Sequence, residues 1–133
     1  MSARRDIEAT LHRFARGFDE DDFDLLAGCM TADVELTSFE GPTSGRDAVL
    51  EMLRGRRDAA GAGGSQPRHL LANVEIAVES DSAASSRASY VLFSAGPGAI
   101  SVVSTGTYDD RLVSDGDAWR VSHRRVNVDR PGV

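Results

Sequence analysis

Five carboxylates crowd into one short segment of the chain, GFDEDDFDLL at residues 17–26. Acidic residues at this density could form a metal-binding loop, a solvated helix start, or the setting of one working carboxylate. The segment lacks the later Gly and the final Glu of an EF-hand loop, which disfavours a calcium site. Negative charge is favourable at a helix start. We therefore expect four of the acids to be solvated there: Glu20, Asp21, Asp22 and Asp24. Asp19 could be a solvated helix-end residue or a functional one.

The three histidines are the other candidates for acid–base chemistry, because imidazole titrates nearest to neutral pH. His12 lies off the apolar stripe of its helix and is expected on the surface. His69 belongs to a strand whose two alternating rows both contain apolar residues, so it is expected either in a pocket or as a structural histidine. His123 could face the same pocket or a partner subunit. Their irregular spacing is a weak signal for metal binding.

Composition limits the classes of partner and chemistry. The chain has 133 residues, a net charge of −6 and no lysine among its 15 basic residues. This length fits a single domain, 1–133, ending in a loose tail at 130–133. The negative charge argues against nucleic acid and membrane partners. Cys29 is the only cysteine and is expected to be buried and structural. The N-terminus lacks a signal-peptide pattern, so we expect a cytoplasmic protein.

The first half of the chain has the apolar spacing of helices. One stripe recurs at the spacing of a helix face: Ile7, Leu11, Phe14 and Phe18. A short second helix would follow, with Asp21 or Asp22 as its N-cap. Residues 33–39 are expected to form a strand, and residues 40–45 a turn. A third helix would begin at Ser44, with Asp47 completing a capping box. A flexible loop would follow at 59–67.

The second half has the alternation of β-strands. Four are expected, at 68–79, 85–95, 99–113 and 118–129, with short connections. In the first of them, Leu70, Val74 and Ile76 would share one face, and His69, Leu71 and Asn73 the other. Three helices followed by antiparallel strands predict an α+β fold, with the helices covering one face of a curved, mostly antiparallel sheet.

The order and spacing of four segments resemble the SnoaL-like branch of the NTF2-like superfamily. These segments are FARGFDEDDFDLLAGCMTADVEL, TSGRDAVLEML, PRHLLANVEIAV and GTYDDRLVSDGDAWRVSHRRV. The resemblance covers about residues 7–129 and implies the cone-shaped fold of scytalone dehydratase, ketosteroid isomerase and polyketide cyclases. It also implies a homodimer.

In dehydratase-like members of this family, the residue matching Asp19 points into the cone and pairs with the residue matching His69. The carboxylate would orient the imidazole, which would then act as the general base without a metal or cofactor. We expect these residues to line the substrate pocket: Phe18, Ser38, Phe39, Met52, Leu71, Asn73, Tyr90, Phe93, Tyr108, Arg111, Trp119 and His123. Arg111, Arg124 and Arg125 could orient an anionic or carbonyl group. The favoured alternative for them is surface charge balanced by Asp109, Asp110 or Asp129.

The sequence also departs from the family patterns. Phe18 and Ser38 stand where scytalone dehydratase has tyrosines, and no histidine occurs near Phe93. The position that matches the catalytic Asp of ketosteroid isomerase lies close to Leu36, so that carboxylate is missing here. The dehydrochlorinase pattern, an Asp–His dyad with an arginine on the late hairpin, fits better. Asp19 and His69 match its dyad, and Arg111 matches its arginine if the alignment contains a gap.

These patterns favour a small lyase, isomerase or cyclase acting on a hydrophobic, oxygenated small molecule. One alternative is a non-catalytic NTF2-like module that binds a ligand or dimerises. A less favoured one is the β-subunit of a ring-hydroxylating dioxygenase.

Overall fold

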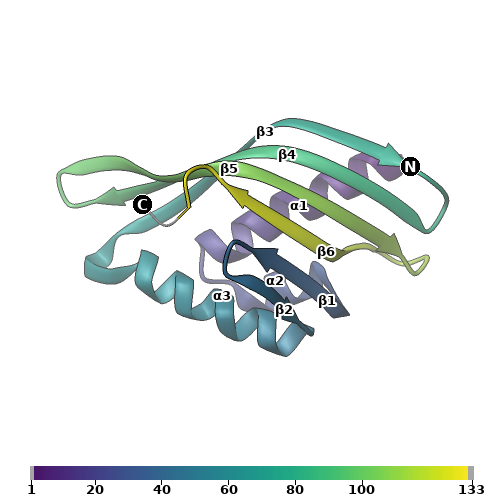
Figure 1. Cartoon of the computed structure of the whole chain (residues 1–133), viewed down its shortest axis with the longest axis horizontal. Helices are drawn as coiled ribbons and strands as arrows, with labels where there is room; N and C mark the ends of the chain where they lie inside the picture. Colours follow the sequence, from purple (N-terminus) through teal and green to yellow (C-terminus); the bar gives the residue numbers. More distant parts are fainter. Residues whose placement is uncertain (1, 132–133) are drawn as a thin grey trace.

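The computed structural model describes residues 2–131, which form a curved sheet with helices on one side (Figure 1). The helices are α1 (Ala3–Asp19), α2 (Phe23–Gly28) and α3 (Arg46–Ala60), and a 3₁₀ turn, η1, covers Ala62–Gly64. The strands are β1 (Met30–Ser38), β2 (Gly41–Ser44), β3 (Gln66–Val78), β4 (Ala83–Gly96), β5 (Ala99–Ser114) and β6 (Trp119–Val128). The predicted α+β class is confirmed.

The six strands lie in the order β2-β1-β6-β5-β4-β3. Every pairing is antiparallel except that of β1 with β6, so the sheet is mixed but mostly antiparallel. The hairpin of β4 and β5 projects beyond the helices at the left of Figure 1. Within residues 2–131, no helix is long and apolar enough to cross a membrane.

Helix α1 forms as its apolar spacing predicts. Ile7, Leu11, Phe14 and Phe18 are all buried, and they join one hydrophobic core with residues of the other helices and the sheet. A Cβ atom on Gly17 would lie 3.0 Å from Leu26, so the missing side chain lets α1 and α2 pack closely. This contact holds the end of α1 against the rest of the molecule.

Two local predictions around α3 are wrong. The segment expected as a turn forms β2, because its backbone pairs with β1 from Ser38 to Glu35. Ser44 does not cap α3: its hydroxyl lies 3.3 Å from the Glu35 carboxylate, and Gly45, with a φ of 90°, occupies the N-cap position. The loop expected at 59–67 is shorter, since α3 continues to Ala60 and β3 begins at Gln66.

A β-bulge changes which residues of β3 face the helices. The register with β4 shifts between Ala72 and Glu75, and Asn73 has a left-handed backbone with a φ of 54°. His69 and Leu71 therefore face inward before the bulge, whereas Val74 and Ile76 face inward after it. The prediction of one uniform alternation along this strand is wrong.

The tail begins after β6. Arg130 and Pro131 are exposed, and residues 132–133 of the predicted loose tail lie outside the described residues.

Candidate functional site

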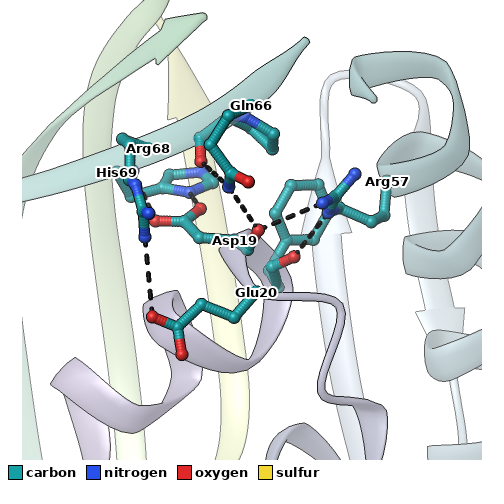
Figure 2. A network of polar contacts seen from close by, with 8 residues as sticks. Asp19, Glu20, Arg57, Gln66, Arg68 and His69 are labelled. Carbon is teal, nitrogen blue, oxygen red and sulfur yellow. Dashed lines mark hydrogen bonds and ion pairs between the residues drawn. The ribbon is translucent and has the colours of Figure 1, made fainter. Parts of the chain in front are cut away.

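Asp19 and His69 meet where the end of α1 contacts the start of β3 (Figure 2). The Asp19 carboxylate accepts a hydrogen bond from His69 Nδ1 at 2.6 Å and a second from the His69 backbone N–H at 2.7 Å. The two side chains are only 6% and 11% exposed. The contact between the two residues is thus present, across fifty positions of sequence.

Neighbouring polar groups fix the backbone beneath this pair (Figure 2). Arg57 of α3 donates to the carbonyl oxygens of Phe18, at 2.9 Å, and Asp19, at 3.2 Å. Gln66 of β3 donates to the Asp19 carbonyl at 2.7 Å. These bonds occupy carbonyl groups that the end of an α-helix leaves without partners. They join α1, α3 and β3 at the position that sets the direction of the Asp19 side chain.

The geometry determines which nitrogen of His69 is available. An ionised carboxylate can only accept hydrogen bonds, so the bond to Asp19 places a proton on Nδ1. Nε2 forms no hydrogen bond within residues 2–131, and the ring lines the main cavity. Nε2 of the neutral ring therefore offers a lone pair to a molecule in that cavity.

The cavity lies between the helix-facing side of the sheet and helices α1 and α3, and its volume is about 450 Å³. Its wall is mostly apolar, with Leu11, Phe14, Leu53 and Leu92 among the lining residues. Val103 also lines it and is 59% exposed, so the cavity opens to solvent near the β4–β5 hairpin. Such a volume and lining are typical of a site for a small organic molecule.

Aromatic rings continue the wall beyond the dyad. Phe18 meets the His69 ring edge to face, at 5.3 Å between centroids. Tyr90 lies 6.3 Å from His69 and stacks on Tyr108 at 4.5 Å, with an angle of 6° between the rings. Gly106 makes room for this stack, because a Cβ atom there would lie 2.7 Å from the Tyr90 ring. The two tyrosines form a flat surface inside the cavity.

A buried ion pair follows the tyrosine stack. Arg124 donates from Nε and Nη2 to the two Asp110 oxygens at 2.9 and 2.8 Å. Both residues are 4% exposed, and Arg124 lines the cavity. Burial lowers the pKa of Arg124, but the negative charge of Asp110 and the hydrogen bonds to it raise this pKa, and the net change is upward. Arg124 therefore remains a cation within the apolar wall.

The tyrosine hydroxyls are protonated hydrogen-bonding groups at neutral pH. Burial raises the pKa of Tyr108 far above its usual range, and it also raises the pKa of Tyr90. The Tyr90 hydroxyl lies 2.9 Å from Ser104 Oγ. The two tyrosine hydroxyls can donate hydrogen bonds to a bound oxygen, but they are poor candidates for a general base.

Of the expected pocket residues, Phe18, Leu71, Tyr90 and Tyr108 line the cavity, as His69 does. Four others lie elsewhere because of strand geometry. Asn73 is exposed at the bulge, and Phe93 follows Leu92 and so takes the opposite face of β4. Arg111 and His123 pair in register on the outer face of the sheet and line a separate hollow there.

The remaining four residues expected in the pocket also lie outside it. Ser38 and Met52 line a separate surface hollow beside β2. Phe39 is 58% exposed in the turn after β1. Trp119 is buried in the core beneath α1, and its carbonyl accepts a hydrogen bond from Thr10 Oγ1 at 2.9 Å. None of these four lines the main cavity.

The acidic segment divides as expected. Asp22 is the N-cap of α2 and accepts a hydrogen bond from the Leu25 N–H at 3.1 Å. Glu20 and Asp21 form exposed ion pairs with Arg68 and Arg54. Asp19 alone is buried against a histidine. Residues 2–131 contain no group of three or more His, Cys, Asp or Glu side chains arranged to hold a metal ion.

The favoured sequence prediction for Arg124, a surface charge balanced by Asp109, Asp110 or Asp129, is wrong about its environment. The prediction includes the observed partner, Asp110, but the pair is buried. The available signal was alternation: Tyr108, Asp110 and Leu112 occupy every second position of β5, and all three are buried.

Comparison with known proteins agrees with this architecture. The sequence model of the SnoaL-like domain matches residues 1–125. No curated protein sequence matches the chain. A variant of Rv3472, a protein of unknown function from Mycobacterium tuberculosis, is similar at 27% identity and a TM-score of 0.78, covering 93% of this chain and 70% of that one.

Two further solved structures share the fold. Aln2 from a Streptomyces species has 22% identity and a TM-score of 0.85, covering 96% of this chain and 93% of its own. A putative scytalone dehydratase from Novosphingobium aromaticivorans has 21% identity and a TM-score of 0.80, covering 95% and 83%. With the match over residues 1–125, the chain belongs to the SnoaL-like domain family, and its curved sheet and three helices have the fold of NTF2-like proteins.

Proposed function

We propose that the protein is a lyase, isomerase or cyclase that uses cofactor-independent acid–base chemistry on a hydrophobic, oxygenated small molecule. The observation that carries the proposal is the Asp19–His69 contact of 2.6 Å on the wall of a mostly apolar cavity. An oriented imidazole with a bare nitrogen is the arrangement that general-base catalysis needs. The NTF2-like superfamily, which includes cofactor-free isomerases and cyclases, makes this chemistry plausible for the fold.

The proposed reaction begins with His69 Nε2 taking a proton from a carbon next to a substrate carbonyl. The C–H bond breaks, and its electrons form the C=C bond of an enolate. Asp19 stabilises the imidazolium that results, because its carboxylate already accepts the Nδ1–H bond. The imidazolium then returns the proton, either to a carbon in an isomerisation or to a hydroxyl that leaves as water in a dehydration.

The first step can be tested without knowledge of the natural substrate. The protein should accelerate exchange of the acidic C–H protons of 2-tetralone in D₂O, followed by NMR. His69→Gln should lower the enzyme-dependent rate by about 10²–10⁴-fold. His123→Gln is the matched control, because that ring lies on the outer face of the sheet. Equal rates for the wild type and His69→Gln would refute the proposed role of His69.

A ligand-binding module is the second candidate, and it would use the same cavity. The mostly apolar cavity supports this function as well as the first, but a ligand-binding module would bind 2-tetralone without proton exchange. The exchange experiment therefore separates the two functions directly.

A further inference from the structure

Side chains of the protein surround the guanidinium group of Arg124 on most sides. The Phe14 and Tyr108 rings lie 4.1 and 4.0 Å from its central carbon. The edge carrying Nε and Nη2 is occupied by the two oxygens of Asp110. A planar guanidinium has two faces and donors along its rim, so these contacts leave the Nη1 end as its main available donor.

Nη1 has no partner of its own. Within residues 2–131 it donates to no protein atom, although the residue is 4% exposed and lines the cavity. Nη1 is also not fully shielded from solvent. Among the described residues, the buried side-chain polar atom without a hydrogen-bond partner is Thr31 Oγ1, and Nη1 is not in that class. An unpartnered donor that faces a cavity marks a position where a bound molecule can place an acceptor.

The charge of Asp110 determines which acceptor fits. The pair Arg124–Asp110 is already neutral in sum, and its Arg124 lines the mostly apolar wall of the cavity. A ligand carboxylate would add a second negative charge beside Asp110, with one cation between them, and would lose its hydration. A neutral carbonyl oxygen can accept the Nη1–H bond without either cost. The stacked Tyr90 and Tyr108 rings beside Arg124 offer a flat surface to a planar ring.

We propose that Arg124 is a specificity-determining residue that selects neutral, planar ring compounds with a carbonyl group over carboxylates. The carbonyl oxygen accepts a hydrogen bond from Nη1, and the ring lies against the tyrosine stack. This inference rests on the proposed function in one respect, since it places the reactive carbon on the side of the ring toward His69. The selectivity itself is a property of binding and does not require turnover.

Three probes with one ring system test the inference: 2-acetylnaphthalene, 2-ethylnaphthalene and 2-naphthoate. Their dissociation constants can be measured by equilibrium dialysis at neutral pH, where the naphthoate is ionised. A hydrogen bond to a charged donor predicts binding of acetylnaphthalene about tenfold or more tighter than ethylnaphthalene. Naphthoate should bind at least about tenfold more weakly than acetylnaphthalene. Naphthoate binding as tightly as acetylnaphthalene, or tighter, would overturn the inference.

Asp110→Asn provides the sharper test, because it leaves the Arg124 charge without a counterion in nearly the same shape. This variant should reverse the order and bind naphthoate most tightly, and naphthoate should raise its melting temperature more than acetylnaphthalene does. Asp109→Asn is the matched control: the same change one residue away, on the outer face, should keep the wild-type order. If Asp110→Asn does not fold, the order of the three probes on the wild type still decides.

Failure of this inference can be distinguished from failure of the proposed function. His69→Gln should keep the wild-type order of the three probes while losing proton exchange of 2-tetralone. If the wild type binds the three probes in the expected order of affinity but does not exchange the protons of 2-tetralone, only the proposed function is contradicted. If the wild type exchanges the protons of 2-tetralone but binds naphthoate as tightly as acetylnaphthalene, only the proposed selectivity is contradicted.

Discussion

Each face of the sheet carries a histidine–carboxylate pair, and the two pairs differ in every respect that matters for chemistry. On the inner face, His69 and Asp19 are 2.6 Å apart and 11% and 6% exposed. On the outer face, His123 and Glu35 are 3.5 Å apart and 32% and 44% exposed. The inner pair adjoins an apolar cavity, whereas the outer hollow is lined by charged residues such as Arg87 and Asp109. Residue type alone therefore does not distinguish the two pairs; burial and orientation do.

Adjacent residues repeat this contrast with arginine. In the register of β5 and β6, Asp110 pairs with Arg124, and Asp109 pairs with Arg125. The first pair is buried with two short hydrogen bonds. Asp109 instead contacts Arg87 at 3.7 Å and Asn127 at 2.9 Å on the exposed face. One residue of displacement along a strand separates a buried carboxylate, paired with Arg124, from an exposed one.

The largest effect should come from breaking the buried arginine pair. Asp110→Asn leaves the Arg124 cation without a counterion and should lower the free energy of unfolding by about 3–5 kcal/mol. Asp109→Asn should cost at most about 1 kcal/mol, because its ion pair is exposed. Chemical denaturation of both variants measures the difference. Equal losses would show that the inner and outer pairs do not differ as described.

The next effect concerns the carboxylates of the two histidine pairs. Asp19→Asn replaces the acceptor that orients His69 and stabilises its cation, so the exchange rate of 2-tetralone should fall by about 10²-fold or more. Glu35→Gln changes the outer pair in the same way and should leave the rate within about twofold, because an exposed pair contributes little. A comparable loss in both variants would place the effect outside the dyad.

A smaller effect should appear in the titration of the tyrosines. The chain has only two, Tyr90 and Tyr108, and burial raises the pKa of both. The folded protein should therefore show less phenolate absorbance at about pH 10 than the unfolded chain, whose tyrosines are about half ionised there. Because the folded pKa values are the higher ones, their stabilising contribution is complete below the unfolded pKa and declines as pH rises above it. Titration of the folded protein at about pH 10 would contradict the buried stack.

Much of the framework could be predicted from sequence because its signals are local or periodic. The spacing of Ile7, Leu11, Phe14 and Phe18 predicted α1, and the acidic segment predicted an N-cap at Asp21 or Asp22, of which Asp22 is the one observed. The pairing of Asp19 with His69 came from the family resemblance, since no local rule joins positions fifty residues apart. The position of Asp19 depends on Arg57 and Gln66, whose hydrogen bonds fix the end of α1.

The errors came from interruptions of periodicity and from charges that fold inward. The bulge at Asn73 exchanges the two faces of β3, and its backbone conformation is rare for a residue other than glycine. Arg124 and Asp110 look like surface charges until the register of β5 and β6 brings them together. A buried ion pair depends on both partners being placed, and neither segment alone specifies this.

In the arrangement proposed for the site, Asp19 holds His69 with its proton on Nδ1 and with Nε2 bare toward the cavity. Nitrogen-15 NMR of the histidine rings, on protein labelled at histidine and assigned with His69→Gln, measures this directly at a pH where the ring is neutral. Nδ1 should have the chemical shift of a protonated nitrogen and Nε2 that of an unprotonated one, and the Nε2 shift should change when 2-tetralone binds. A proton on Nε2, or a ring that exchanges between both tautomers, would contradict this arrangement.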